Sequence, residues 1–94
     1  MSSACVSSGV LTTDSLVSAK RVKLVSVHCS CSTGGTVTIK VYDSGTATAV
    51  GKVEVARMIV GAGTSNEFDM HGRVMAEGIY VDITGTGSYS IEFA

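Results

Sequence analysis

The sequence predicts an all-β protein, an antiparallel β-sandwich of about seven to eight strands with a jelly-roll or immunoglobulin-like arrangement. Three observations lead to this fold class. Short segments alternate between apolar and polar residues, with turn signals about every eight to twelve residues. Valine and threonine, which favour strands, are abundant, and 11 glycines are available for turns. No segment shows the periodicity of an amphipathic helix. The 94 residues are expected to form a single domain over residues 1–94.

The N-terminal part of the chain carries the weakest strand pattern. Residues 1–8 are expected to form an extended arm, because disorder concentrates at chain ends that lack a pattern. The segment Leu16–Ala19 is either a short helical turn or an extended edge strand. The opening residues contain no basic segment followed by an apolar run, so no secretory signal peptide is expected.

The segment from Val22 to Asp43 predicts two strands that form a hairpin. The first strand, Val22–Cys31, alternates apolar residues with serine and histidine, and a phase change after Leu24 indicates a β-bulge. The return strand begins at Val37 and has its apolar residues at every second position. Pairing Cys31 with Val37 brings the two apolar faces to the same side of the predicted hairpin.

The middle of the chain contains the first candidate interface residues. A loop of small residues, Asp43–Gly51, precedes the strand Lys52–Val60, which is apolar on both faces. Such a strand is expected to be central in its sheet or to lie against a neighbouring subunit. The candidate protein-interface residues of this region are Thr46, Thr48, Met58 and Val60.

The C-terminal segment Gly78–Ala94 predicts a second hairpin around a short glycine-containing loop. If Ile83 pairs with Tyr89, every apolar residue of one strand faces an apolar residue of the other. Tyr80 and Asp82 then lie on the opposite face, where they are exposed to solvent or to a partner. They are therefore added to the candidate interface residues.

Two short segments contain residue types that carry chemistry in other proteins. The segment His28–Cys31 offers potential metal ligands, but its histidine projects away from its two cysteines, and zinc sites usually use Cys-x-x-Cys spacing in a turn. The segment Asp69–Arg73 contains a histidine and an arginine without a nucleophile in a recognised setting, so a break between strands is expected there. The chain is therefore expected to be neither an enzyme nor a metal or cofactor protein.

Charge and hydropathy narrow the classes of partner. Seven Lys and Arg stand against eight Asp and Glu, giving a net charge of −1, and the one basic cluster is Lys20–Lys23. A nucleic-acid surface needs a basic stripe with stacking rings, so no nucleic acid is expected. No apolar run is long enough to span a bilayer, so no membrane is expected. The odd number of cysteines, three, argues against a disulfide framework.

Three stretches, Val37–Asp43, Phe68–Val74 and Gly78–Gly87, resemble small virion proteins of tailed bacteriophages, marine (cyanophage-like) ones in particular. In that family a Phe-Asp corner followed by Gly-Ile-Tyr-Val-Asp recurs in short, proline-poor structural proteins. The resemblance implies a virion component of the capsid decoration (cement) type that is made in the host cytoplasm and is not secreted. Its partner would be the major capsid protein or another virion protein. A homotrimer is expected, because closed symmetry presents one patch repeatedly to a lattice.

The alternative is an accessory module of a tail or fibre that binds a host surface glycan or another virion protein. Such a module needs exposed aromatic side chains that stack on sugar rings. Tyr42 and Tyr80 are the candidates, because the predicted C-terminal hairpin places Tyr89 in the core.

Overall fold

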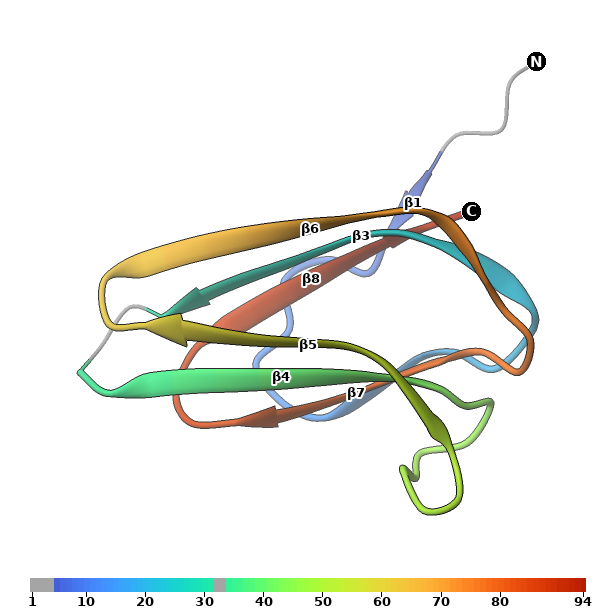
Figure 1. Ribbon diagram of the computed structural model, residues 1–94, viewed down its shortest axis with the longest axis horizontal. Helices are drawn as coiled ribbons and strands as arrows, with labels where there is room; N and C mark the ends of the chain where they lie inside the picture. Colours follow the sequence, from blue (N-terminus) through green and yellow to red (C-terminus); the bar gives the residue numbers. More distant parts are fainter. Residues whose placement is uncertain (1–4, 32–33) are drawn as a thin grey trace.

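Two antiparallel sheets of four strands each make up the fold in this computed structural model, which describes residues 5–31 and 34–94. In chain order the strands are β1 (Val6–Ser7), β2 (Ser15–Ser18), β3 (Val22–Cys31), β4 (Thr36–Asp43), β5 (Val53–Gly61), β6 (Thr64–Met75), β7 (Ile79–Thr84) and β8 (Ser88–Phe93). One sheet has the order β1-β8-β3-β6, and the other has the order β2-β7-β4-β5 (Figure 1). The predicted all-β sandwich is therefore confirmed, and no helix occurs in the described ranges.

The strand pairing is nested along the chain. β1 pairs with β8, β2 with β7, β3 with β6 and β4 with β5, in every case antiparallel. The resulting double ribbon is rolled over the core, because β3 also pairs with β8 and β4 also pairs with β7. This nested order is that of a jelly roll of eight strands and two Greek keys, rather than the immunoglobulin-like alternative.

The two predicted hairpins were wrong in their pairing and correct in their buried faces. β7 and β8 belong to different sheets, as do β3 and β4, so the turns between them cross from one sheet to the other. Most residues expected inward are nevertheless buried, including Val81 and Ile91, which are both 0% exposed. A turn that crosses between sheets requires the same alternation of apolar residues as a hairpin, so the pattern alone does not distinguish them.

A single hydrophobic cluster fills the space between the sheets. Leu24 and Ile91 come from the first sheet and Ile39 and Ile79 from the second, and all four are 0% exposed. Burying each of these side chains contributes roughly 1.5–3 kcal/mol before the entropy of ordering is counted. Cys29 also lies in this core, and burial raises the pKa of its thiol, with a further contribution from the neighbouring cysteine. The predicted inward orientation of Cys29 and Cys31 in β3 is thus confirmed.

A distortion shared by β3 and β6 corresponds to two sequence predictions. The register of β3 shifts between Leu24 and Ser26 against both of its neighbours, which confirms the predicted bulge. On the facing strand, His71 (φ 54°) and Gly72 (φ 71°) have left-handed backbone conformations. The expected break at this point is thus a distortion within the long strand β6 and not the end of a strand.

Three other segments complete the comparison with prediction. β2 takes the edge alternative expected for Leu16–Ala19, and β5 is an edge strand although its apolar pattern favoured a central position. Residues 1–4 of the expected N-terminal arm lie outside the described residues. Within that arm, Val6 and Ser7 form β1 and pair with β8.

Candidate functional site

The outer face of the sheet β2-β7-β4-β5 brings together side chains that are far apart in the sequence. Tyr80 of β7 pairs with Tyr42 of β4, and their rows continue to Leu16 on one side and Glu54 on the other. The next row along the strands contains the pairs Asp82–Lys40 and Lys40–Arg57. We call this surface the tyrosine face. Its members are Leu16, Lys40, Tyr42, Glu54, Arg57, Tyr80 and Asp82.

The two tyrosine rings lie against each other at the centre of the tyrosine face. Their centroids are 6.3 Å apart and their planes are inclined by 35°. Both side chains are partly exposed on this outer face. Burial, and then the charges of nearby carboxylates, raise the pKa of Tyr42 and of Tyr80. Both hydroxyls therefore keep their protons at neutral pH and can donate as well as accept hydrogen bonds.

The charged groups beside the rings are held in place by defined partners. Arg57 donates from Nε to Glu54 Oε2 at 2.8 Å and from a terminal nitrogen to Oε1 at 2.9 Å, which is a bidentate pair. This pairing lowers the pKa of Glu54. Asp14 accepts a hydrogen bond from the backbone amide of Ile83 at 2.8 Å. Burial, and then the charge of Asp14, raise the pKa of Asp82 although Lys40 opposes the shift.

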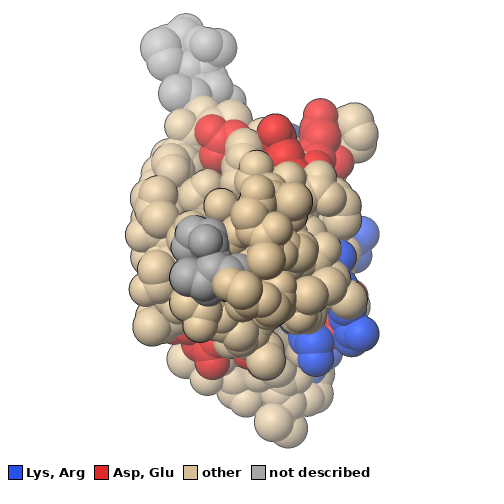
Figure 2. All heavy atoms as spheres, turned by 90° about the vertical axis from the view of Figure 1, so that its left-hand side faces the viewer, with Lys and Arg blue, Asp and Glu red and all other residues tan. Residues whose placement is uncertain are grey.

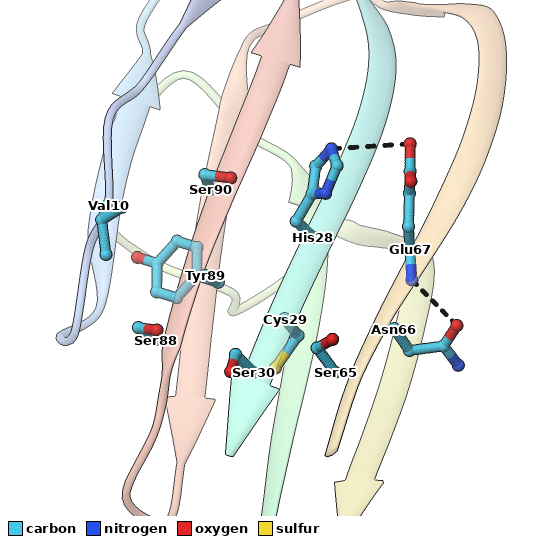
Figure 3. Close-up of a pocket in the computed structure, with 10 residues that line it drawn as sticks. All are labelled: Val10, His28, Cys29, Ser30, Ser65, Asn66, Glu67, Ser88, Tyr89 and Ser90. Carbon is cyan, nitrogen blue, oxygen red and sulfur yellow. Dashed lines mark hydrogen bonds and ion pairs between the residues drawn. The ribbon is translucent and has the colours of Figure 1, made fainter. Parts of the chain in front are cut away.

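The opposite outer face, on the sheet β1-β8-β3-β6, is chemically different. A shallow groove of about 520 Å³ runs over β8, β3 and β6, and its lining includes four serines, Asn66, Glu67 and His28 (Figure 3). His28 Nε2 lies 3.5 Å from Glu67 Oε2 and 3.7 Å from Glu92 Oε1. Ser26 donates to Glu92 at 2.6 Å. No exposed aromatic ring lies in this groove, whose one tyrosine, Tyr89, is 2% exposed.

One end of the sandwich forms a third surface. The turns Gly61–Thr64 and Thr84–Ser88, together with Gly34–Thr36, contain glycine, alanine, serine and threonine and no charged residue. Figure 2 looks onto this end and shows Lys and Arg only along one side of it. We call the surface formed by these three segments the uncharged end.

The structure separates the predicted interface residues. Tyr80 and Asp82 lie on the tyrosine face, as their outward position predicted. Thr46 and Thr48 lie in the loop between β4 and β5, where buried Ser44 Oγ lies 2.7 Å and 3.1 Å from their carbonyl oxygens.

The assignment of Met58 and Val60 to a surface interface has to be corrected. They are 2% and 3% exposed and belong to the core, because β5 turns these residues inward. The exposed apolar residue of this strand is Ile59, which is 64% exposed.

The partners of Tyr80 were missed by sequence reasoning. The alternation in β4 places Lys40 and Tyr42 outward, and the alternation in β7 places Tyr80 and Asp82 outward. The alternation identifies the outward residues of each strand, but it does not show that the two strands are neighbours. The predicted hairpin made Glu92 the neighbour of Tyr80, whereas the actual neighbours are Tyr42 and Leu16.

In the part of the chain that the structure describes, no three His, Cys, Asp or Glu side chains are grouped so as to hold a metal ion. The described residues likewise contain no helix that is long and apolar enough to cross a membrane.

Comparison with known proteins adds no relative. No protein-family model, curated protein or solved structure matches this chain. The function is therefore inferred from the residues and geometry of the chain itself.

Proposed function

We propose that this chain is a structural protein of a bacteriophage virion, of the capsid decoration type, which binds and stabilises the head lattice. The observation that carries the proposal is the jelly-roll strand order, an architecture that occurs in viral capsid proteins. Fold alone does not define function, so this support is an analogy. It agrees with the resemblance of three stretches of the chain to small virion proteins of tailed phages.

Two of the three stretches that carry the resemblance, Val37–Asp43 and Gly78–Gly87, meet at one corner of the fold. Asp43, at the end of β4, accepts hydrogen bonds from the backbone amides of Glu77 and Gly78, at the start of the β7 segment. β4 and β7 are also neighbours in their sheet. These residues thus act as a scaffold, and we infer that the chain works by binding rather than by catalysis.

The uncharged end supports contact with a protein lattice. Removing charged side chains from water is expensive, and the centres of protein interfaces are correspondingly depleted of them. The turns Gly61–Thr64 and Thr84–Ser88 supply many small polar groups and no charge, so their desolvation costs little. We place the lattice contact at this end.

A charge-insertion pair tests the proposal. Ala62 lies at the uncharged end, and Ala47 is an equally exposed alanine in the loop between β4 and β5. Co-sedimentation with heads that lack the protein should saturate for the unmodified chain and for Ala47→Glu, and should fall at least about tenfold in affinity for Ala62→Glu. An unmodified chain that stays in the supernatant overturns the decoration role. Equal binding by both variants would instead show that the lattice contact lies on a surface other than the uncharged end.

The oligomeric state follows from the same proposal. A homotrimer presents three copies of the uncharged end to sites of matching symmetry. Because Met58 and Val60 are in the core, the subunit contact would have to use exposed residues of the same edge strand, with Ile59 as its apolar centre. Native mass spectrometry that finds only monomer at micromolar concentration argues against the trimer.

The alternative role is that of a tail or fibre accessory module that binds a glycan. One specific observation favours it, since the fold places Tyr42 and Tyr80 in contact on an outer face. Tail localisation in virions labelled with an antibody against the chain would select this role over capsid decoration.

A further inference from the structure

The tyrosine face combines two partly exposed aromatic rings with fixed polar groups. The tyrosine pair occupies adjacent central strands of its sheet, β7 and β4. Leu16, at 38% exposure, extends the apolar surface on the side of β2. Tyrosine rings present an apolar surface at a small cost in side-chain entropy and keep a polar hydroxyl at the rim. The centre of this face is thus suited to contact a ligand that presents a flat, weakly polar surface.

The groups around the rings supply both kinds of hydrogen-bonding partner. Lys40 and Arg57 are donors, and Glu54 and Asp82 are acceptors. The bidentate pair of Arg57 with Glu54 holds both side chains in one geometry before any ligand arrives. Such fixed groups lose little entropy on binding.

The distribution of charge limits the class of ligand. Three carboxylates, those of Asp14, Glu54 and Asp82, surround the ring pair, and only Lys40 and Arg57 oppose them. A phosphate, a sialic acid or a uronic acid would meet net repulsion there. A purely apolar ligand would leave the charged groups desolvated and without partners. A neutral molecule with many hydroxyl groups satisfies donors and acceptors together.

We propose that the tyrosine face is a binding site for an uncharged saccharide. A sugar ring lies with its C–H face on the rings of Tyr80 and Tyr42, and its hydroxyl groups donate to Asp82 and accept from Lys40 and Arg57. The site is distinct from the uncharged end that is proposed to contact the lattice. It therefore does not depend on the decoration role, and it specifies a ligand class for the tail or fibre alternative.

The natural tyrosine fluorescence of the chain provides a direct readout. The sequence has three tyrosines and no tryptophan, and Tyr89 is only 2% exposed in the core. A ligand stacked on the tyrosine face thus changes the emission of the other two. The unmodified protein is titrated with neutral oligosaccharides and with sialylated and uronic-acid oligosaccharides. Saturable changes with a neutral sugar and none with the acidic sugars are expected.

Variants locate the binding. Tyr80→Ala should lower the affinity by up to about tenfold, since the loss of a stacked ring is worth up to about 1.5 kcal/mol. Tyr80→Phe keeps the ring and should bind within about threefold of the unmodified chain. Arg57→Ala, at an exposed edge position, tests the polar contacts if Tyr80→Ala does not fold, and should also weaken binding. His28→Ala on the opposite sheet is the matched control and should bind normally.

Four results would overturn the saccharide site, the first three of which concern sugar binding. These three are no binding of any neutral glycan on an array at millimolar ligand, binding that is unchanged in both Tyr80→Ala and Arg57→Ala, and a preference for acidic glycans. Capture of a protein ligand that competes at this face without any sugar binding would also overturn it. None of these outcomes affects head co-sedimentation by Ala47→Glu and Ala62→Glu, so failure of the decoration role is recognised separately.

Discussion

The carboxylate of Asp43 accepts a hydrogen bond of 2.8 Å from the backbone amide of Glu77, which lies 34 residues further along the chain. The same carboxylate accepts from the amides of Ala76 at 3.0 Å and of Gly78 at 3.4 Å. One side chain at the end of β4 thus satisfies successive donors of the turn that links β6 to β7. The turn leads from one sheet to the other, so this contact connects both layers of the sandwich.

We expect Asp43→Ala to lower the free energy of unfolding by about 1.5–3 kcal/mol, because hydrogen bonds to a charged group are lost and the amides of the turn lose their acceptor. Urea denaturation followed by circular dichroism measures this change. Glu67→Ala is the control, since Glu67 is largely exposed and its ion pair is with His28. It should change stability by less than about 0.5 kcal/mol. Equal effects of the two variants would contradict a specific role for Asp43.

The same carboxylate should make stability depend on pH. Burial alone would raise the pKa of Asp43, but its three backbone hydrogen bonds outweigh burial and lower the pKa below the ordinary value. The folded state therefore favours the ionised form. Its stabilisation is fully present above the unfolded pKa of about 4 and is lost as the pH falls through the lower folded pKa. Urea denaturation from pH 7 to pH 2 should show the stability difference between the unmodified chain and Asp43→Ala shrinking only in acid. A difference that stays constant would exclude this linkage.

The sequence contained enough information to define the buried face of most strands, although not that of β5, whose Met58 and Val60 point inward. The alternation at Cys29 and Cys31 correctly predicted two inward side chains with His28 outward, and the phase change after Leu24 correctly predicted the bulge. These are local properties, because a strand alternates its side chains whatever its neighbours are. The fold class, which depends on local patterns, was accordingly predictable.

The neighbours of each strand were not predictable in the same way. The apolar residues that end at Ile83 and begin again at Tyr89 alternate as they would in a hairpin. However, β7 pairs with β4, and β8 pairs with β3. Pairing between strands is a long-range property, and several partners satisfy one apolar pattern equally well. The tyrosine face depends on just this pairing. Sequence reasoning therefore identified Tyr42 and Tyr80 as separate exposed rings and could not place them in contact.

Asp82, in the second row of the tyrosine face, should affect stability in the opposite direction to Asp43, because its pKa is raised and not lowered. Burial, and then the nearby charge of Asp14, raise the pKa of Asp82, so the folded state disfavours its ionised form. The penalty is absent below the unfolded pKa of about 4 and develops as the pH rises through the raised folded pKa. Asp82→Asn should therefore raise the melting temperature at pH 7 and have little effect at pH 3. A lower melting temperature for the variant at pH 7 would mean that the pairing of Asp82 with Lys40 dominates.

Gly78 is the glycine at which an added Cβ would meet the closest atom. Its φ of 153° is unfavourable for other residues, and an added Cβ would lie 2.1 Å from the carbonyl oxygen of Ser18 and 2.7 Å from that of Ser44. Both obstacles are backbone atoms that cannot move aside cheaply. Gly78→Ala should cost more than about 3 kcal/mol, enough to prevent folding of a small domain.

The matched substitution elsewhere should be harmless. Gly34→Ala places its Cβ in open space, at a backbone conformation that other residues adopt, so stability should stay the same or rise by up to about 1 kcal/mol. Soluble yield and thermal unfolding compare the two variants. The amide of Gly78 also donates to Asp43 Oδ1 at 3.4 Å, so this glycine belongs to the turn that Asp43 binds. A stable, folded Gly78→Ala protein would therefore contradict the close packing of β7 against the ends of β2 and β4, on which the jelly-roll corner depends.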